Sequence, residues 1–143
     1  MTNTAILSLS THGNPTTGYL SFFELHKEIP FHIKRIYYTY NVPVNTKRGM
    51  HAHKKLKQIL WCPYGIIEVF LNDGTKTETY LLDVPEKALL IGNGIWHDMH
   101  WKKEGSVLCV AASDYYYEED YIRDYNEFLR NVQDGYWKNE NKL

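Results

Sequence analysis

Short segments rich in β-branched and aromatic residues follow one another from about residue 4 to about residue 112, with turn signals between them. The run Lys34–Tyr40 is typical of a strand. Asn72-Asp73-Gly74 separates two further runs and is a strong hairpin signal, because Gly, Asn and Asp tolerate the positive φ of tight turns. A first turn is expected at residues 12–15, where Gly, Asn and Pro occur together. About nine or ten strands are predicted in this way, which indicates an all-β sandwich or barrel.

The periodicity of the apolar residues changes after Asp114. Apolar side chains then recur three and four residues apart, with acidic residues between them, as in an amphipathic helix. We predict a helix over about residues 115–133, capped by Ser113 or Asp114 and with acidic side chains near its positive N-terminal end. The apolar positions are Tyr117, Tyr121, Ile122, Tyr125, Phe128, Leu129 and Val132.

Length and composition exclude several classes of protein. The 143 residues fit one domain, 1–143, that can bury a core without disulfides. Lys and Arg number 16 against 17 Asp and Glu, so no broad basic surface for nucleic acid is expected. Cys62 and Cys109 lie in apolar strand-like segments, which favours reduced thiols and a cytoplasmic location. The chain shows no secretion signal at its start and no apolar run of roughly 18 residues, so no membrane partner is expected.

Two histidines separated by one residue are the strongest candidates for chemistry. In a strand, His51 and His53 point to the same face because side chains alternate with a period of two. His97 follows a Gly-containing turn further along the chain, and the two segments suggest a common pocket. Imidazoles change protonation near neutral pH, which suits general acid–base catalysis. The residues alone leave open whether these histidines are catalytic or merely hydrogen-bonded in the core.

The spacing Gly49-x-His51-x-His53-x4-Gln58-x6-Gly65, followed by Gly94-x2-His97, resembles the two motifs of the cupin superfamily. Several sequence motifs resemble more closely those of the sugar 3,4-ketoisomerases, which act on dTDP-4-keto-6-deoxy-D-glucose in the biosynthesis of 3-amino-3,6-dideoxy sugars. The resemblance implies a cupin double-stranded β-helix, or jelly-roll barrel, with a C-terminal α-helix. The motifs that carry it are Lys34-Arg35-Ile36-Tyr37-Tyr38, Arg48–Lys55, Gly94-Ile95-Trp96-His97, Ala112-Ser113-Asp114-Tyr115-Tyr116 and Asp120–Tyr125.

The resemblance also implies roles for the histidines. Moving a ketone from C4 to C3 needs a base at C3, stabilisation of an enediolate and proton delivery at C4. His51 and His53 are the expected catalytic pair, with His51 implied as the base. His97 is expected at the sugar end of the pocket, where it influences the configuration at C4, with the region of Thr17 as the opposing wall. Whether the product has the galacto or the gluco configuration stays open.

Three further residues are candidates for substrate binding. Arg48 carries a fixed charge that can bind a pyrophosphate through two hydrogen bonds. Tyr38 can donate a hydrogen bond to the enediolate or to a phosphate, although Tyr37 and Tyr38 point to opposite faces and only one reaches the pocket. Gln58 stands where metal-binding cupins have Glu, and an amide is a poorer metal ligand than a carboxylate. We therefore expect no metal and no other cofactor.

Three functions remain open from the sequence. The first, which we expect, is a metal-free ketoisomerase acting on a dTDP-linked 4-keto-6-deoxy sugar. The second is a metal-dependent cupin enzyme, such as a dioxygenase, that uses His51, His53, Gln58 and His97. The third is a non-catalytic sugar-binding cupin. The apolar, aromatic N-terminal strands are expected to help form a homodimer, as they do in proteins this chain resembles, because pairing covers exposed sheet edges.

Overall fold

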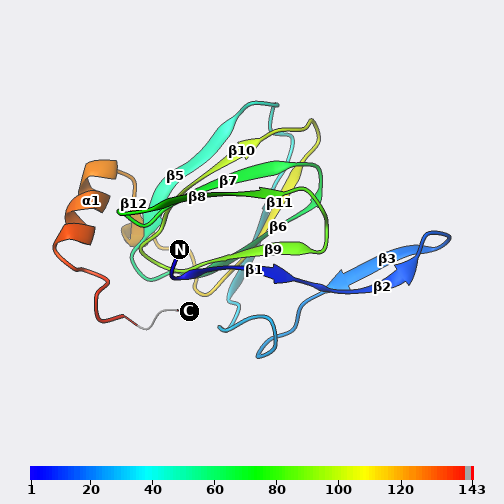
Figure 1. Cartoon of the computed structure of the whole chain (residues 1–143), viewed down its shortest axis with the longest axis horizontal. Coiled ribbons are helices and arrows are strands. Elements are labelled where there is room, and N and C mark those ends of the chain that lie inside the picture. The colour runs from blue at the N-terminus through cyan, green and yellow to red at the C-terminus, as the bar shows by residue number, and fades with distance from the viewer. Residues whose placement is uncertain (141–142) are drawn as a thin grey trace.

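Two five-stranded antiparallel sheets face each other and form the body of the protein (Figure 1). The structure is a computed structural model and describes residues 1–140 and 143; residues 141–142 of the predicted domain lie outside this part. One sheet has the order β1-β9-β6-β11-β4 and the other the order β12-β5-β10-β7-β8. The strands are β1 (Thr4–Ser8), β2 (Ser10–Asn14), β3 (Gly18–Phe22), β4 (Arg35–Thr39), β5 (Lys47–His53), β6 (Gln58–Tyr64), β7 (Ile67–Asn72), β8 (Thr77–Leu82), β9 (Lys87–Ile91), β10 (Trp96–Trp101), β11 (Val107–Ala112) and β12 (Tyr121–Ile122).

The predicted all-β architecture is confirmed, with eleven strands in the described part up to residue 112. The added strand is β2, part of which was wrongly predicted as a turn at residues 12–15. β2 instead pairs with β3 in a hairpin, and the reversal falls after Asn14. The Asn14 side chain accepts hydrogen bonds from the backbone N–H groups of Thr16 and Thr17 at 2.9 and 3.1 Å. This side chain therefore stabilises a turn at residues 15–17, later in the chain than the predicted turn at residues 12–15.

The space between the two sheets is filled by apolar side chains from alternating positions of the facing strands. Leu71 of β7, Leu89 of β9 and Trp101 of β10 are completely buried there, as the two-residue period of a strand requires. The indole N–H of Trp101 donates to the carbonyl of Ser106 at 3.0 Å. Packing in this core fixes the positions of the facing strands relative to one another.

The C-terminal helix is shorter than predicted. α1 spans Tyr125–Gln133, and its N-terminal cap is Asp124, whose carboxylate accepts from the N–H of Glu127 at 2.7 Å. The predicted start at residue 115 and the predicted caps Ser113 and Asp114 are wrong. Residues 118–120 form a single 3₁₀ turn, η1, and β12 then pairs with β5. Pairing with a neighbouring strand overrides the local helical period, because strand hydrogen bonds and burial outweigh weak propensities.

The outer face of the first sheet is only partly covered. Ile29 and Phe31, from the segment between β3 and β4, pack against it beside Leu90. Ile36 and Tyr38 of β4 remain mostly exposed, each with 64% of its surface accessible. The β2–β3 hairpin projects beyond this sheet (Figure 1). Among the described residues, no helix has the length and apolar character needed to cross a membrane.

Candidate active site

Three histidines meet at one end of the second sheet. β10 places His97 directly opposite His51 of β5, and β12 places Tyr121 opposite His53. The ring of His51 lies 4.9 Å from that of His53 and 4.6 Å from that of His97, measured between centroids. The ring of Tyr121 lies 4.5 Å from that of His53. The structure therefore brings His51, His53 and His97, from two separate segments of the chain, together in one cluster.

A β-bulge in β5 decides where Arg48 points. Neighbouring residues of β10, His97 and Asp98, pair with His51 and Gly49, so Met50 is an extra residue in β5. Met50 has a positive φ of 54°, a strained conformation for a non-glycine residue. Gly49 has φ +96°, and a Cβ there would lie 2.8 Å from the carbonyl oxygen of His97. The extra residue shifts the alternation by one position, so that Arg48 and His51 line the same cavity.

A cavity of about 250 Å³ lies between β4, β5, β10 and β11. Arg48 and His51 are on its wall, whereas His53 and His97 lie against His51 and are almost fully buried, with 2% and 1% of their surfaces exposed. The remaining wall residues are Arg35, Tyr37, Thr39, Gly49, Met99, Trp101, Leu108 and Tyr121. His51 is therefore the histidine that a molecule in this cavity meets first.

The tyrosine that faces the cavity is Tyr37, and the prediction for Tyr38 is wrong. Tyr37 lines the cavity, and its hydroxyl donates to Oε1 of Gln58 at 3.1 Å. Burial, with a smaller contribution from Tyr121, raises the pKa of Tyr37 to about 12. Tyr38 points to the opposite face of β4, since neighbouring side chains of a strand alternate. Tyr37 stays a neutral hydrogen-bond donor at physiological pH.

A second fixed cation, Arg35, lines the same cavity. Its guanidinium lies 5.3 Å from the ring centroid of Tyr37 and 5.6 Å from that of Tyr116, distances typical of cation–π contacts. The Nε atom of Arg35 is buried and has no hydrogen-bond partner among the described residues. The cavity therefore combines two arginines with a neutral phenol, a composition suited to an anionic ligand.

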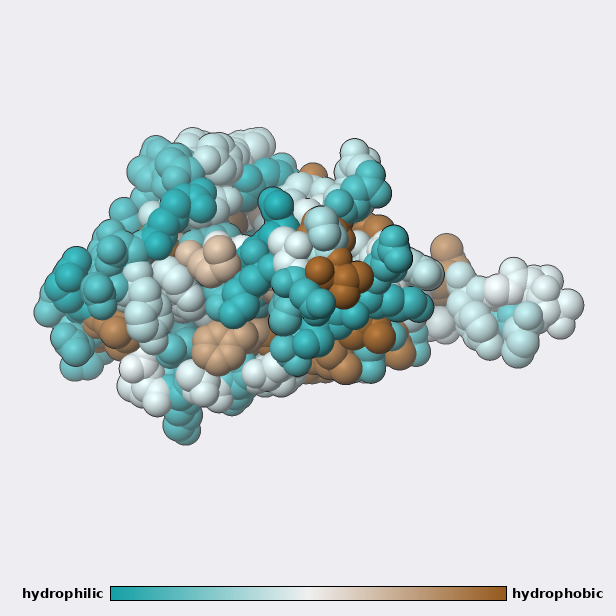
Figure 2. Space-filling view, turned by 90° about the horizontal axis from the view of Figure 1, so that it is seen from above, coloured by the Kyte–Doolittle hydropathy of each residue, from teal (hydrophilic) through white to brown (hydrophobic). Residues whose placement is uncertain are grey.

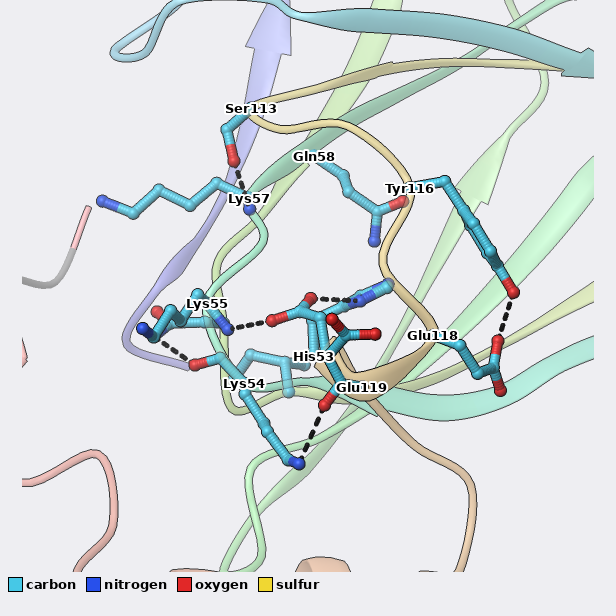
Figure 3. A network of polar contacts seen from close by, with 12 residues as sticks. His53, Lys54, Lys55, Lys57, Gln58, Ser113, Tyr116, Glu118 and Glu119 are labelled. Atoms are coloured by element: carbon cyan, nitrogen blue, oxygen red, sulfur yellow. Dashed lines mark hydrogen bonds and ion pairs between the residues drawn. The ribbon is translucent and has the colours of Figure 1, made fainter.

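The segment between β11 and α1 forms hydrogen bonds with His53, the last residue of β5, and with the two lysines that follow it (Figure 3). Nδ1 of His53 lies 3.0 Å from Oδ2 of Asp120. The other carboxylate oxygen of Asp120 accepts from the backbone N–H of Lys55 at 2.8 Å. The ammonium of Lys54 donates to the carbonyl of Glu119 at 2.8 Å. Asp120 is thus held in place on one side while it contacts the imidazole on the other.

The three imidazoles are neutral at physiological pH. Burial is the main cause, because a charged imidazolium loses its hydration in this site. It lowers the pKa of His51 to about 4, with the neighbouring His53 adding to the effect. Burial also lowers the pKa of His53, against the opposing influence of Asp120, and it lowers the pKa of His97, with the neighbouring His51 and His53 adding to the effect. Burial acts to raise the pKa of Asp120, but the hydrogen bonds from His53 and Lys55 bring it below its ordinary value.

The cluster has the dimensions of a metal site. Each imidazole offers one nitrogen, and these nitrogen atoms all lie within 4.8 Å of one another. Three neutral imidazoles are a ligand set that zinc, nickel or iron accepts. The fourth cupin position, Gln58, is buried and its Oε1 accepts from Tyr37. The carboxylate that completes a metal-binding cupin motif is thus replaced by an amide engaged elsewhere.

Sequence reasoning missed three residues of this site. Tyr121 and Asp120 were included in a predicted helical segment, and Arg35 was noted only as part of a motif. Alternation within β4 offered a signal for Arg35, because it shares a face with Tyr37. For Tyr121 and Asp120 the signal was the Tyr-Ile pair itself, which is compatible with a short strand as well as with a helix.

Comparison with known proteins supports the geometry. A family model, FdtA (WxcM-like, C-terminal), matches residues 2–133. The chain belongs to the FdtA family. A curated relative from Aneurinibacillus thermoaerophilus, named TDP-4-oxo-6-deoxy-alpha-D-glucose-3,4-oxoisomerase, is 44% identical over 115 residues, which cover 80% of this chain and 83% of the relative. The expected membership of the sugar 3,4-ketoisomerase branch is confirmed.

Solved structures give the same result for the fold. The crystal structure of a 3,4-ketoisomerase from Helicobacter canadensis has a TM-score of 0.88 and 43% identity, covering 93% of this chain and 99% of that chain. A mutant of the 3,4-ketoisomerase QdtA from Thermoanaerobacterium thermosaccharolyticum, in complex with TDP-4-keto-6-deoxyglucose, has a TM-score of 0.87 and 36% identity, covering 92% and 95%. The predicted cupin-type barrel with a C-terminal helix is therefore confirmed.

Proposed function

We propose that this protein is a sugar nucleotide 3,4-ketoisomerase that converts dTDP-4-keto-6-deoxy-D-glucose to a dTDP-3-keto-6-deoxyhexose. The observation that carries the proposal is the cavity in which a neutral imidazole, His51, faces a neutral phenol and two arginines. A base, a hydrogen-bond donor and fixed positive charge are what the conversion of an anionic keto sugar requires. The relative solved with TDP-4-keto-6-deoxyglucose supports this choice of substrate.

In the proposed reaction, His51 removes the proton from C3 of the sugar. The electrons of the C3–H bond form a C3–C4 double bond, and the C4 oxygen becomes an enediolate oxygen. Tyr37 donates a hydrogen bond to the developing charge, in the role first expected for Tyr38. Protonation of C4 and transfer of the C3 hydroxyl proton to the C4 oxygen leave the ketone at C3. His53 is the second imidazole of the pair and exchanges protons with the first.

The two arginines provide for the nucleotide part of the substrate. Arg48 is exposed at the cavity and is free to bind the diphosphate through two hydrogen bonds. Arg35 lies on the same wall and adds a second positive charge. Gln58 acts through Tyr37, whose hydroxyl it holds. The buried ring of His97 packs against the ring of His51 and, in this proposal, influences proton delivery at C4.

The decisive experiment couples the reaction to an amination that only a 3-keto sugar undergoes. The purified protein is incubated with dTDP-4-keto-6-deoxyglucose, a PLP-dependent 3-aminotransferase and an amino donor, and products are analysed by mass spectrometry and NMR. We expect a 3-amino-3,6-dideoxy sugar nucleotide. Recovery of unchanged 4-keto sugar in the presence of an active aminotransferase would contradict the proposal.

A metal-dependent reaction is the second candidate, because the three imidazole nitrogens lie within 4.8 Å of one another. The engaged Gln58 amide weighs against it. Metal analysis of the active protein separates the two. We expect full activity after removal of metal with EDTA. Loss of activity that returns with stoichiometric Fe, Mn, Ni or Zn would instead favour the metal-dependent enzyme.

We also propose that the protein is a cytoplasmic homodimer and that residues 1–143 form one cupin domain. The β2–β3 hairpin stands clear of the body of the protein (Figure 2), and Tyr19 and Leu20 on it are about two-thirds exposed. A cavity of about 790 Å³ between the hairpin, Trp61 and Pro85 offers room for side chains of a second copy. Thr17 lies at the hairpin turn, away from the cavity of its own chain. Sedimentation at micromolar concentration tests the dimer, and a monomer would contradict it.

A further inference from the structure

The imidazoles of the cluster differ in what holds their second nitrogen. Nδ1 of His97 lies 3.0 Å from the carbonyl oxygen of Ile95, and Nδ1 of His53 lies 3.0 Å from a carboxylate oxygen of Asp120. Nδ1 of His51 is buried and has no partner among the described residues. Only His53 is therefore held by a group that carries a charge.

The contact between His53 and Asp120 fixes the position of a proton. An ionised carboxylate can only accept, so Nδ1 of His53 must donate, and the neutral ring then keeps its lone pair on Nε2. Both side chains are shielded from water, with 2% of His53 and 15% of Asp120 exposed. Asp120 cannot swing away easily, because its other oxygen accepts from the N–H of Lys55 at 2.8 Å.

We propose that Asp120 is a positioning residue that locks His53 in the tautomer with its proton on Nδ1 and its lone pair on Nε2. The inference rests on the proposed function for its catalytic consequence. A locked tautomer leaves His53 ready to accept a proton at Nε2 beside His51, and the carboxylate stabilises the imidazolium that results. Asp120 does not line the cavity of His51, so it acts through His53 and not on the substrate.

The placement of Asp120 depends on the segment after the barrel. β12 pairs Tyr121 with His53 and Ile122 with Ala52, and Asp120 directly precedes this pair. Ile122 is completely buried against Ala52, Trp96 and Phe128. The packing of α1 and β12 on β5 therefore holds the carboxylate within reach of the imidazole.

The substitution Asp120→Asn tests the tautomer directly. The amide has one acceptor oxygen in place of two, and the backbone N–H of Lys55 still needs a partner. The oxygen therefore stays on Lys55 and the NH₂ group turns to Nδ1 of His53, which inverts the tautomer. We expect kcat to fall about 10²–10⁴-fold with KM nearly unchanged. Glu119→Gln is the matched control, because it removes the adjacent carboxylate while the backbone carbonyl that holds Lys54 remains.

The tautomer itself is read by long-range ¹H–¹⁵N correlation NMR of EDTA-treated, ¹⁵N-labelled protein at neutral pH. We expect a protonated Nδ1 on His53 in wild type and in Glu119→Gln, and a protonated Nε2 in Asp120→Asn. A protonated Nε2 in wild type would overturn the proposal, as would a wild-type kcat in Asp120→Asn. The wild-type spectrum needs neither substrate nor a variant that folds. An inactive wild type would contradict the proposed function alone.

Discussion

The two faces of strand β4 show how one short segment serves two surfaces. Arg35 and Tyr37 face the cavity, where Tyr37 is mostly buried and hydrogen-bonded to Gln58. Ile36 and Tyr38, at the alternate positions, are each 64% exposed on the outside of the sheet. Tyr37 and Tyr38, which are chemically equivalent and adjacent, thus differ in hydration and in the charges around them. The face of the sheet on which a side chain lies, more than its residue type, therefore decides whether it can take part in the proposed reaction.

The same contrast holds in β10, where His97 faces the cluster and His100 faces outward. His100 lies 3.9 Å from a carboxylate oxygen of Glu68 on the neighbouring strand. A comparison of one substitution on the cavity face with the same substitution on the outer face therefore separates a role in the reaction from general stability.

We expect the largest difference in turnover between His51→Asn, on the cavity face, and His100→Asn, on the outer face. An amide keeps much of the polarity and shape of the imidazole but cannot accept the C3 proton, so turnover should fall about 10⁴-fold, to the limit of detection. Nucleotide binding, measured by calorimetry with TDP, should stay nearly intact. His100→Asn should keep its activity. Turnover at the wild-type rate in His51→Asn would remove His51 from the mechanism.

A smaller effect is expected for Tyr37→Phe against Tyr38→Phe. Loss of a hydrogen bond to the enediolate should lower kcat about 10²-fold, whereas loss of an exposed hydroxyl should change kcat by less than about threefold. Steady-state assays of both variants give the measurement. Equal effects of the two substitutions would show that the two faces of β4 do not differ in function.

The two faces of β5 can be compared through the kinetic constants of Arg48→Ala and Lys47→Ala. Arg48 lines the cavity, whereas Lys47 pairs with the outward-facing His100. If Arg48 binds the diphosphate equally in the ground state and the transition state, its loss should raise KM about tenfold and leave kcat nearly unchanged. Lys47→Ala should change neither. A decrease confined to kcat in Arg48→Ala would contradict the binding role.

The stability of the protein should depend on pH through the buried histidines. The pKa of His51 is about 4 in the folded protein, below 6.5 for the free side chain, and those of His53 and His97 are lowered in the same direction. As the pH falls below 6.5, the unfolded chain binds protons that the folded chain does not, so the free energy of unfolding decreases until the folded histidines also titrate.

The measurement is urea unfolding, followed by tryptophan fluorescence, at about pH 7.5 and about pH 5. The midpoint should be lower at the acidic pH, and the difference should shrink in His51→Asn but persist in His100→Asn. Equal midpoints at the two pH values would show that burial of the three histidines does not lower the free energy of unfolding at acidic pH.

The smallest effect is expected for His97→Asn on the configuration at C4 of the product. His97 contacts the ring of His51, and its loss should change the proton path to C4 and hence the ratio of galacto to gluco products. NMR of the accumulated 3-keto sugar, or of its amine, from wild type and variant gives that ratio. An unchanged configuration formed at an unchanged rate would exclude His97 as the stereochemical determinant.

Most of the strands, the shared face of His51 and His53, and the family could be predicted from the amino-acid sequence alone. The alternation of a strand places His51 and His53 on one side without knowledge of any partner. The hairpin at Asn72-Asp73-Gly74 was equally readable, since Gly74 has the positive φ of 90° and its N–H donates to the Asn72 side chain. These features depend on residues close together in the chain, whose conformational preferences are local.

Which side of each strand lines the cavity depends on contacts between segments that are distant in the sequence. Alternation separates Tyr37 from Tyr38, and the pairing of β4 with β11 sets Tyr37 opposite Val110, a buried residue of the core between the sheets, so Tyr37 faces inward. The bulge at Met50 depends on the pairing of β5 with β10, and it reverses the face that simple alternation gives to Arg48. The segment before α1 has a helical period, yet pairing of Tyr121 with His53 extends it and delivers Asp120. Contacts between distant segments set these outcomes, because they bury more surface and satisfy more backbone groups than the local alternatives do.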